Sequence, residues 1–409
     1  MKNIASIVLV AGLALAGSVH AQFDASLLEQ ARKHREPLVE ELARLVDIDT
    51  GTDDAEGLGK VEAILAQRLR ELGAQVDVRP SPPAAGRSVI GTFRGNGTKN
   101  ILLMIHFDTV FPKGEVAKRP FKVVDNRAYG PGVADAKGGA LLILHALDLL
   151  RERRFENHGV LTVLFNPDEE KSSLGSRAII RELAPRNDYV LVFEPPETDR
   201  VTVGTNGIAY VHLDVQGRAS HAGSAPEAGR NAAMELAHQM LQLNGLGNRE
   251  KGTTVNWTFV QAGIGVNTIP EKASATADMR MSDLSELARV QADADRIVQN
   301  KLIPDTTVIV KVEDRRPPFS RNAATNALAA TADSIYTELG KRIASAAMRY
   351  GTDAGFAYDP KSPDKPAVLD GMGIVGDRIH TVDEWADLDS IAPRLYLTVR
   401  MIEKLSATP

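Results

Sequence analysis

The sequence predicts an α/β fold, in which a mixed, mostly parallel sheet is covered by helices on both faces and carries an inserted ferredoxin-like α+β domain. Three observations support this prediction. Residues 160–165 form an uninterrupted apolar run, which is typical of a strand buried on both faces. Strand-like and helix-like segments alternate from residue 75 to residue 194, as they do in parallel or mixed sheets. Between residues 206 and 316 the order becomes β-α-β-β-α-β, the split-βαβ arrangement of ferredoxin-like domains.

The larger domain begins with two amphipathic helices. Apolar residues recur at helical spacing over residues 38–45 and 61–69, and the second helix stops at Gly73. Further along we expect strands at 75–78, 88–93, 100–105, 160–165 and 189–193, with helices over 140–150 and 174–183. The chain then closes with a helix over 327–339, a strand at 367–369 and a last helix over 391–405.

The inserted domain shows the alternation of apolar and polar residues that half-buried strands require. Strands are expected at 208–215, 253–261, 272–280 and 307–312, and helices at 231–243 and 284–298. The pair Pro317-Pro318 marks the return to the larger domain. The expected division is therefore 22–205 and 317–409 for the larger domain, and 206–316 for the insertion.

Residues 1–21 have the features of an export signal. Lys2 supplies a positive start, residues 4–16 are apolar, and Val19-His20-Ala21 forms a small-x-small cleavage site before Gln22. The apolar stretch is too short to span a membrane comfortably, and no later stretch approaches the necessary length. We expect a periplasmic or secreted protein with no membrane segment after cleavage.

Composition narrows the class further. The formal net charge is −5 and the chain has no basic block, which argues against nucleic acid as a partner. Cysteine is absent, so this exported protein must rest on its hydrophobic core or on a bound metal instead of disulfides.

Metal-binding residue types cluster at the expected strand ends. His106 and Asp108 close the strand at 100–105, and they share one side because residues i and i+2 of a strand do. The acidic residues Asp168-Glu169-Glu170 follow the buried strand, at the edge where open α/β sheets keep their ligands. Adjacent buried carboxylates repel each other, so they need a cation or a raised pKa. Three further candidates stand at strand ends or beside helices: Asp135, Glu194 and His380.

This set of donors suits a pair of metal ions. Imidazole and carboxylate ligands without thiolates favour zinc, with cobalt or manganese as substitutes. Two ions about 3.5–4 Å apart need a bridging carboxylate and an acid that is not a ligand and can act as base. Each residue alone has an ordinary interpretation, since Asp135 could cap a helix and His380 could be a surface residue. Their joint placement favours the metal site.

The motifs that carry these residues resemble a known family. They are MIHFDTV at 104–110, GPGVADAKGG at 130–139, DEE at 168–170 and FEP at 193–195, followed by GRASHAG at 217–223 and GTDA at 351–354. In this order they resemble the zinc-dependent aminoacylases and carboxypeptidases, a family that includes acetylornithine deacetylase and succinyl-diaminopimelate desuccinylase. The resemblance covers nearly all of the mature chain and is greatest to the secreted bacterial glutamate carboxypeptidases that act on folates.

The resemblance implies a role for each residue of the metal site. His106, Asp135 and Glu194 would bind one zinc, and Asp135, Glu170 and His380 the other, so that Asp135 bridges. Glu169 would be the general base. Asp108 would hold the far nitrogen of His106. The family also has a cis peptide bond after the bridging residue, here between Asp135 and Ala136.

The inserted domain would be a lid and a dimerisation domain, and the larger domain would be catalytic. His221, in the lid, would stabilise the oxyanion, usually in the site of a neighbouring subunit, which implies a homodimer. Asn267 and Arg280 would contact the terminal carboxylate of the substrate. Two features depart from the family pattern: Ala136 stands where a second acid is common, and Tyr350 where a second glycine is common.

We therefore predict a two-zinc metallohydrolase that releases a C-terminal amino acid from an N-acyl, peptide or folate-type substrate. Arg200 and Arg316 stand near the two crossings between the domains, so we expect them to border the cleft and face the acidic side chain of a product such as glutamate. An aminoacylase that prefers apolar amino acids is an alternative.

Three other classes of protein agree less well with the sequence. Residues 371–376, GMGIVG, match a dinucleotide-binding fingerprint, but no apolar helix and no second strand follow. The chain contains no Gly-x-Ser-x-Gly, which argues against a serine hydrolase. A noncatalytic exported binding protein would be expected to have lost Glu169 or a ligand, and none is lost.

Overall fold

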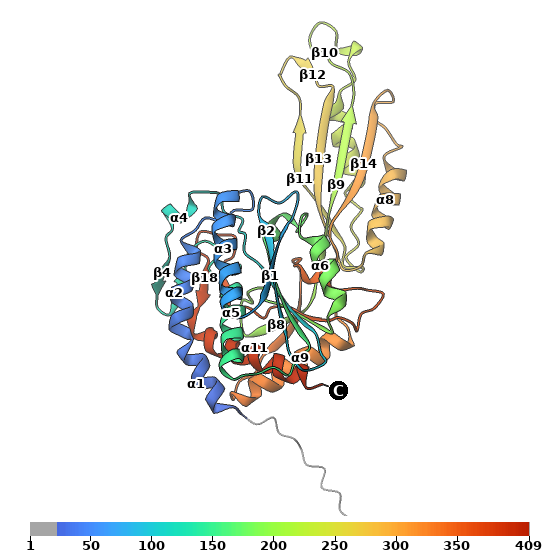
Figure 1. Cartoon of the computed structure of the whole chain (residues 1–409). Coiled ribbons are helices and arrows are strands. Elements are labelled where there is room, and N and C mark those ends of the chain that lie inside the picture. Colours follow the sequence, from blue (N-terminus) through green and yellow to red (C-terminus); the bar gives the residue numbers. More distant parts are fainter. Residues whose placement is uncertain (1–22, 409) are drawn as a thin grey trace, which may run out of the picture.

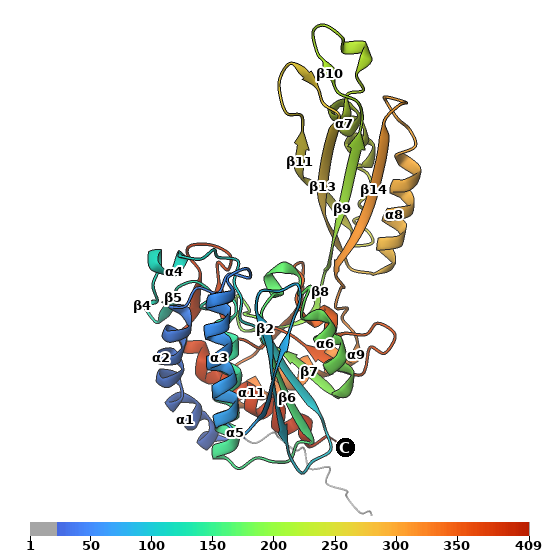
Figure 2. The same ribbon diagram turned by 45° about the horizontal axis from the view of Figure 1, so that its top comes forward.

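The computed structural model describes residues 23–408, and the export signal expected over residues 1–21 lies outside them. The described chain forms a body and a lid. The lid, Gly207 to Arg316, stands out from one end of the body (Figure 1) and remains clear of it in a tilted view (Figure 2).

The body is built on a six-stranded sheet with the order β1-β2-β6-β3-β7-β16. β6, β3, β7 and β16 run parallel, while β2 pairs antiparallel with both β1 and β6. This confirms the expected mixed, mostly parallel sheet. The strands are β1 (Gln75–Pro80), β2 (Arg87–Arg94), β3 (Ile101–His106), β6 (Val160–Asn166), β7 (Tyr189–Val192) and β16 (Ala367–Leu369).

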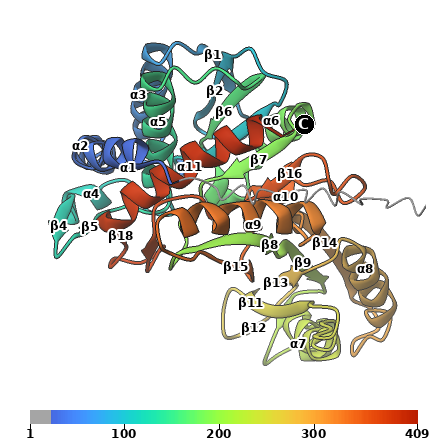
Figure 3. The ribbon, with the colours of Figure 1, turned by 90° about the horizontal axis from the view of Figure 1, so that it is seen from below.

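The two faces of this sheet are buried in two separate hydrophobic cores. On β3, Leu103 and Ile105 enter one core and Leu102 and Met104 the other, because successive side chains of a strand alternate. Helix α6 (Arg177–Leu183) and α10 (Ala354–Ala357) cover the smaller core. The larger core is covered by α1 (Ala25–Lys33), α2 (Arg35–Val46), α3 (Ala55–Glu71), α5 (Lys137–Glu152), α9 (Ala323–Glu338) and α11 (Ile391–Ser406). Seen from below, α11 lies between α5 and α9 (Figure 3).

Several short elements of the body were not expected from the sequence. β8 (Arg200–Thr205) pairs in parallel with β15 (Ala344–Met348). A second small sheet joins β4 (Lys122–Val124), β5 (Arg127–Tyr129), β17 (Gly376–Asp377) and β18 (Trp385–Asp387), and α4 (Glu115–Lys118) precedes it. The glycine-rich residues 371–376 run from β16 into β17 and open no helix, which excludes the dinucleotide-binding interpretation.

The lid is an antiparallel sheet of order β11-β13-β9-β14 with two helices on one face. It has its own core, which includes Val211, Leu213 and Met279. Its elements are β9 (Gly207–Gln216), α7 (Ala232–Leu243), β11 (Thr254–Ala262), β13 (Lys272–Met281), α8 (Ser285–Ile297) and β14 (Thr307–Arg316). The short strands β10 (Ser220–His221) and β12 (Thr268–Ile269) pair at the tip, far from the body (Figure 1).

The lid is joined to the body at a narrow root. Thr205 and Phe319, which flank the lid in sequence, exchange two backbone hydrogen bonds of 2.8 and 3.1 Å. Gly207 begins the lid and Arg316 ends it, close to the expected limits of 206 and 316.

Among residues 23–408, no helix combines the length and the apolar character needed to cross a membrane.

Candidate metal centre

Three residues from different elements meet at the carboxyl end of the body sheet. His106 is the last residue of β3, Glu194 follows β7, and Asp135 lies just before α5. Nε2 of His106 is 3.0 Å from Asp135 Oδ1 and 3.7 Å from Glu194 Oε2. All three side chains are buried, and each offers a ligand atom within 4.8 Å of the other two.

A second group of three shares Asp135 with the first. Nε2 of His380, in the turn between β17 and β18, is 3.2 Å from Asp135 Oδ2 and 3.1 Å from Glu170 Oε2. Asp135 therefore directs one oxygen toward each group, which is the arrangement of a bridging carboxylate. The two groups contain the residues that the sequence assigned to the two metals. The peptide bond between Asp135 and Ala136 is cis, as expected.

Asp108 fixes the acidic turn that follows β6. Its Oδ1 accepts a hydrogen bond from the backbone N–H of Glu169 (3.0 Å), and its Oδ2 accepts from the N–H of Glu170 (3.3 Å) and from the hydroxyl of Thr52 (2.7 Å). Oδ1 also lies 3.2 Å from Nδ1 of His106. Asp108 thus orients a histidine of one group and the turn that carries a carboxylate of the other.

Glu384 plays the same part for the loop before α5. Its buried carboxylate accepts hydrogen bonds from the N–H groups of Gly132, Ala134 and Asp135 at 2.9–3.0 Å. Sequence reasoning missed this residue. Glu384 follows His380 by four positions in the same loop, which could have marked it as a candidate for the site. The sequence does not show what its carboxylate contacts.

The electrostatics of the site call for positive charge. Burial, together with the Asp135 carboxylate, raises the pKa of Glu170 to about 8, and burial raises the pKa of Glu194 well above its ordinary value. Hydrogen bonds to Asp135 and Glu170 raise the pKa of His380 to about 11. Burial lowers the pKa of His106, but the carboxylate of Glu194 and its neighbours outweigh this, and the net pKa is raised. The ionised forms of Glu170 and Glu194 are therefore stabilised by a cation placed beside them.

The residues present fit divalent metal ions. Oε1 of Glu170 and Oε1 of Glu194 are buried and have no hydrogen-bond partner among the described residues, so each retains a free acceptor in a dry site. The donors are imidazole nitrogens and carboxylate oxygens, which suit zinc, cobalt or manganese.

Glu169 lies beside the two groups but belongs to neither. It opens the short 3₁₀ turn Glu169–Lys171 and is buried. Its Oε1 accepts a hydrogen bond from Nη1 of Arg316, and its backbone carbonyl accepts one of 2.6 Å from Nη2. Arg316 is only 3% exposed. The expectation that Arg316 faces a substrate side chain stays a prediction, and in this structure two nitrogens of its guanidinium bind Glu169.

His221 belongs to β10, which lies at the tip of the lid, far from the body (Figure 1). The carbonyl of Asn267 accepts a hydrogen bond of 2.9 Å from the N–H of Ala222, so Asn267 lies at the tip as well. Nδ1 of His221 accepts hydrogen bonds of 3.1 Å from the N–H groups of Gly223 and Ser224. In the neutral ring the proton is then on Nε2, so the exposed nitrogen is a donor. The chain's own lid does not bring this donor to its own metal groups.

Arg280 lies at the opposite end of the lid from Asn267. It pairs with Ile208 at the root, and its guanidinium binds both carboxylate oxygens of Asp278, at 2.8 and 2.9 Å. The strand from Lys272 to Arg280 spans roughly 25 Å at about 3.3 Å per residue. Within a single chain the two residues therefore lie too far apart to hold one carboxylate, and the expectation that both contact it stays a prediction that needs Asn267 from a second chain.

Arg200 begins β8, and the crossing to the lid follows the other end of that strand at Thr205. Nη2 of Arg200 lies 3.2 Å from Oε2 of Glu197. β8 separates Arg200 from the root, and Nε and Nη2 of Arg200 are buried without a hydrogen-bond partner among the described residues, so its contact with the substrate stays a prediction.

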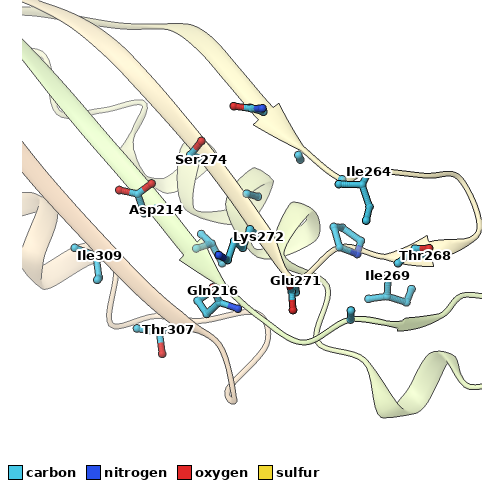
Figure 4. A pocket seen from close by; sticks show the side chains of 17 residues that line it. Asp214, Gln216, Ile264, Thr268, Ile269, Glu271, Lys272, Ser274, Thr307 and Ile309 are labelled. Carbon is cyan, nitrogen blue, oxygen red and sulfur yellow. The ribbon is translucent and has the colours of Figure 1, made fainter.

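Two cavities, one on the body and one on the lid, differ in their position relative to the metal groups. One of about 470 Å³ lies on the body beside the metal groups, and its lining includes Glu170, Thr52 and Phe111. Another, of about 570 Å³, lies near the lid tip on the helix-free face of the lid sheet, between Asp214, Ile264 and Ile309 (Figure 4). The second contains none of the metal-site residues, so the first is the one positioned for chemistry.

Comparisons with known proteins agree with this geometry. A model of the family described as peptidase family M20/M25/M40 matches residues 102–404. Carboxypeptidase G2 of Pseudomonas sp. (strain RS-16) is 39% identical over 399 residues, which cover 96% of this chain and 95% of that protein. Acetylornithine deacetylase of Proteus mirabilis (strain HI4320) is 25% identical over 360 residues, covering 83% of this chain and 88% of that protein.

A solved structure shares the fold. Aminopeptidase PepT from Bacillus cereus ATCC 10987 superposes with a TM-score of 0.72 at 21% identity, covering 91% of this chain and 98% of that one. The family match and the near full-length relative show that this chain belongs to peptidase family M20/M25/M40 and is a hydrolytic peptidase.

Proposed function

We propose that the protein is a two-zinc carboxypeptidase that hydrolyses an amide bond and releases a C-terminal amino acid, glutamate, from an N-acyl, peptide or folate-type substrate. One observation carries the proposal: two donor groups, one buried and one that opens to solvent at His380, share Asp135, and Glu169 stands beside them without belonging to either. The near full-length similarity to a protein named Carboxypeptidase G2 supports the reaction class.

The chain's residues divide the chemistry between them. Two divalent cations held by these groups would polarise an amide carbonyl and promote ionisation of a water molecule. His106, Asp135 and Glu194 would hold one ion, and Asp135, Glu170 and His380 the other. Glu169 would take a proton from the attacking water and pass it to the leaving nitrogen. His221, presented by another subunit, would donate from Nε2 to the oxyanion.

The assignment of Glu169 as base is tested by Glu169→Gln. The amide cannot accept the proton, so kcat is expected to fall by about 10²–10⁴-fold. Because Glu169 is not a ligand, elemental analysis should still find two zinc ions per chain. Glu170→Gln is the matched control, since it changes the neighbouring acid and should lose metal. A Glu169→Gln variant with near wild-type kcat would refute the assignment.

The glutamate preference is tested with two substrates that share one acyl group and end in glutamate or leucine. We expect kcat/KM to favour the glutamate substrate. The alternative is an aminoacylase that prefers apolar amino acids, and a higher kcat/KM for the leucine substrate would establish it. Nε and Nη2 of Arg200 are buried without a hydrogen-bond partner among the described residues, so Arg200 keeps donors for the acidic side chain, whereas Arg316 is bound to Glu169.

We also propose a homodimer formed through the lid. Helix α7 exposes Met234 (54%) and Leu241 (80%), and the edge strand β11 exposes Phe259 (58%). An exposed edge strand next to apolar side chains is a surface that soluble proteins normally cover. A dimer would also carry His221 and Asn267 toward another subunit.

Leu241→Glu tests the dimer. A charge in an apolar contact is expected to give a monomer by light scattering, with loss of activity and retained metal. Ile309→Glu is the control, because Ile309 is also exposed but lies on β14, the opposite edge of the sheet. A Leu241→Glu variant that remains dimeric would place the interface elsewhere.

The export signal adds a location to the proposal. We propose cleavage after Ala21 and a periplasmic or secreted mature protein. The intact mass of protein purified from the extracellular or periplasmic fraction should correspond to a chain that starts at Gln22.

A further inference from the structure

The root of the lid places a buried arginine against the proposed base. Arg316, the last residue of β14, pairs in the lid sheet with Ile208 of β9. Its guanidinium crosses into the body, where Nη1 donates to Glu169 Oε1 and to the carbonyl of Gly351 (2.7 Å), and Nη2 donates to the Glu169 carbonyl (2.6 Å). One side chain therefore joins the lid, the acidic turn and the loop at Gly351.

The geometry is that of a clamp on one carboxylate. Two nitrogens of the same guanidinium bind the side chain and the backbone of the same residue, so they set both the position of the Glu169 turn and the direction of its carboxylate. Charge-assisted contacts of this kind are the strongest and most directional that a side chain makes. Asp353 lies 3.9 Å from Nη2 and is itself held by the Asn166 amide (2.7 Å). The guanidinium is thus buried between two acids.

The contacts leave no exposed part of Arg316 for a substrate. The residue is 3% exposed, both terminal nitrogens donate to protein oxygens, and Nε is buried without a hydrogen-bond partner among the described residues. A neighbouring arginine provides a comparison on the same strand. Arg315 binds Glu313 (2.9 Å) and reaches the Lys171 carbonyl (3.3 Å), so it contacts the same turn but not the base.

We propose that Arg316 is a positioning residue for Glu169: it fixes the carboxylate of the base from the root of the lid, and it does not recognise the substrate. This inference rests on the proposed function, in which Glu169 is the base. The lid root therefore also has an effect on catalysis. Arg316 is the last residue of β14, so any displacement of β14 relative to the body moves the guanidinium that orients Glu169. A misplacement of about 1 Å can lower a rate by about 10²-fold.

A double-mutant cycle with Glu169→Gln tests the proposal. Arg316→Ala alone is expected to lower kcat by about 10²-fold, by the same factor for the glutamate and leucine substrates, with KM changed by less than about threefold. In the Glu169→Gln background the same substitution should change the residual rate by less than about threefold, since residues that act through one another are not additive. Metal content should remain that of the wild type.

Two companion variants guard against a folding effect. Arg316→Lys keeps the charge and one donor, so its loss of kcat should be smaller than that of Arg316→Ala, and added guanidinium ion should partly restore Arg316→Ala. Arg315→Ala, the control, should lower kcat by less than about threefold. If Arg316→Ala does not fold, the cycle is run with Arg316→Lys.

The outcomes separate the inference from the proposed function. Additive effects in the cycle, or a loss confined to the glutamate substrate, would overturn the positioning role and make Arg316 a substrate contact. Wild-type kcat in Glu169→Gln would overturn the assignment of the base, and with it this inference.

Discussion

Two carboxylates that are not proposed ligands determine where the proposed ligands lie. Asp108 binds the N–H groups of Glu169 and Glu170, and Glu384 binds those of the loop that carries Asp135. Backbone N–H groups that point at a buried carboxylate are costly to leave unpaired. These hydrogen bonds therefore hold the bridging residue and the acidic turn in position.

Glu384→Gln is expected to weaken metal binding. The amide replaces one acceptor oxygen with an NH₂ group that faces backbone donors, so the loop around Asp135 loses at least one hydrogen bond. Loss of such a supporting contact typically lowers metal affinity by about 10–100-fold. Competition with a chelating dye measures the affinity, and Asp383→Asn, at the exposed neighbouring position, serves as control. Unchanged affinity in Glu384→Gln would show that the loop is held by other contacts.

At the level of elements, the length of the lid strands decides whether a lid residue can reach the metal site of its own chain or that of another subunit. His221 is at the tip and Arg280 at the root, with most of β13 between them. A residue at the tip cannot reach its own body without a large rotation of the lid. It can serve another chain if the lids pair side by side.

Mixing two inactive variants tests whether His221 acts in the active site of another chain. Glu169→Gln lacks the base and His221→Ala lacks the oxyanion donor, and loss of one such donor costs about 10²–10³-fold in kcat. In a mixed dimer, the His221→Ala body keeps Glu169 and receives His221 from the other chain. Dissociating and recombining the two variants should therefore restore activity at one site per mixed dimer. No recovery, with mixed dimers confirmed by native mass spectrometry, would place His221 in its own site.

The elements that the sequence predicted are those with a strong local pattern. The apolar runs of β6 and α5 depend on burial alone, and both elements are present close to the expected limits. The pair β8 and β15 was missed because its two short strands lie far apart in the chain, and only tertiary contacts make them a sheet. The separation of Asn267 from Arg280 was contained in the sequence, since the predicted strand between them already implied that the two residues serve one site only from two different chains.

The contacts of Arg316 could not be read from the sequence. Its place beside the domain boundary was predicted, but a boundary arginine can face solvent, substrate or protein. Only the folded chain shows that it meets Glu169. The positions of the metal-site residues were easier to predict than the contacts of Arg316. Several of them follow strands of the body sheet, and the carboxyl ends of parallel strands lie along the same edge of a sheet.

At the scale of the whole molecule, the metal site should contribute to stability. Asp135, Glu170 and Glu194 bring three carboxylates together in a buried region, and bound cations would relieve their repulsion. A ligand that binds only the folded state at about 1,000 times its Kd adds about 4 kcal/mol.

Chelation is therefore expected to abolish activity and to lower Tm. Protein treated with EDTA and freed of the chelator should regain both on addition of Zn²⁺, with Co²⁺ or Mn²⁺ as substitutes. Scanning calorimetry and a hydrolysis assay on the same samples measure the two effects. Full activity in protein shown to be metal-free would contradict a metal-dependent mechanism.

The two hydrogen bonds between Thr205 and Phe319 have a consequence for how such a chain can change over evolutionary time. They hold the two ends of the inserted segment side by side within the body. The body therefore contains the same local arrangement that a short hairpin turn between Thr205 and Phe319 would give. The entropic cost of closing a loop grows only with the logarithm of its length, by about 0.6 kcal/mol for each doubling, so a longer or shorter lid changes this cost little. The lid also carries its own core. Lengthening, replacing or removing it would leave the register of the central sheet untouched, which makes the lid the part of this architecture most open to exchange.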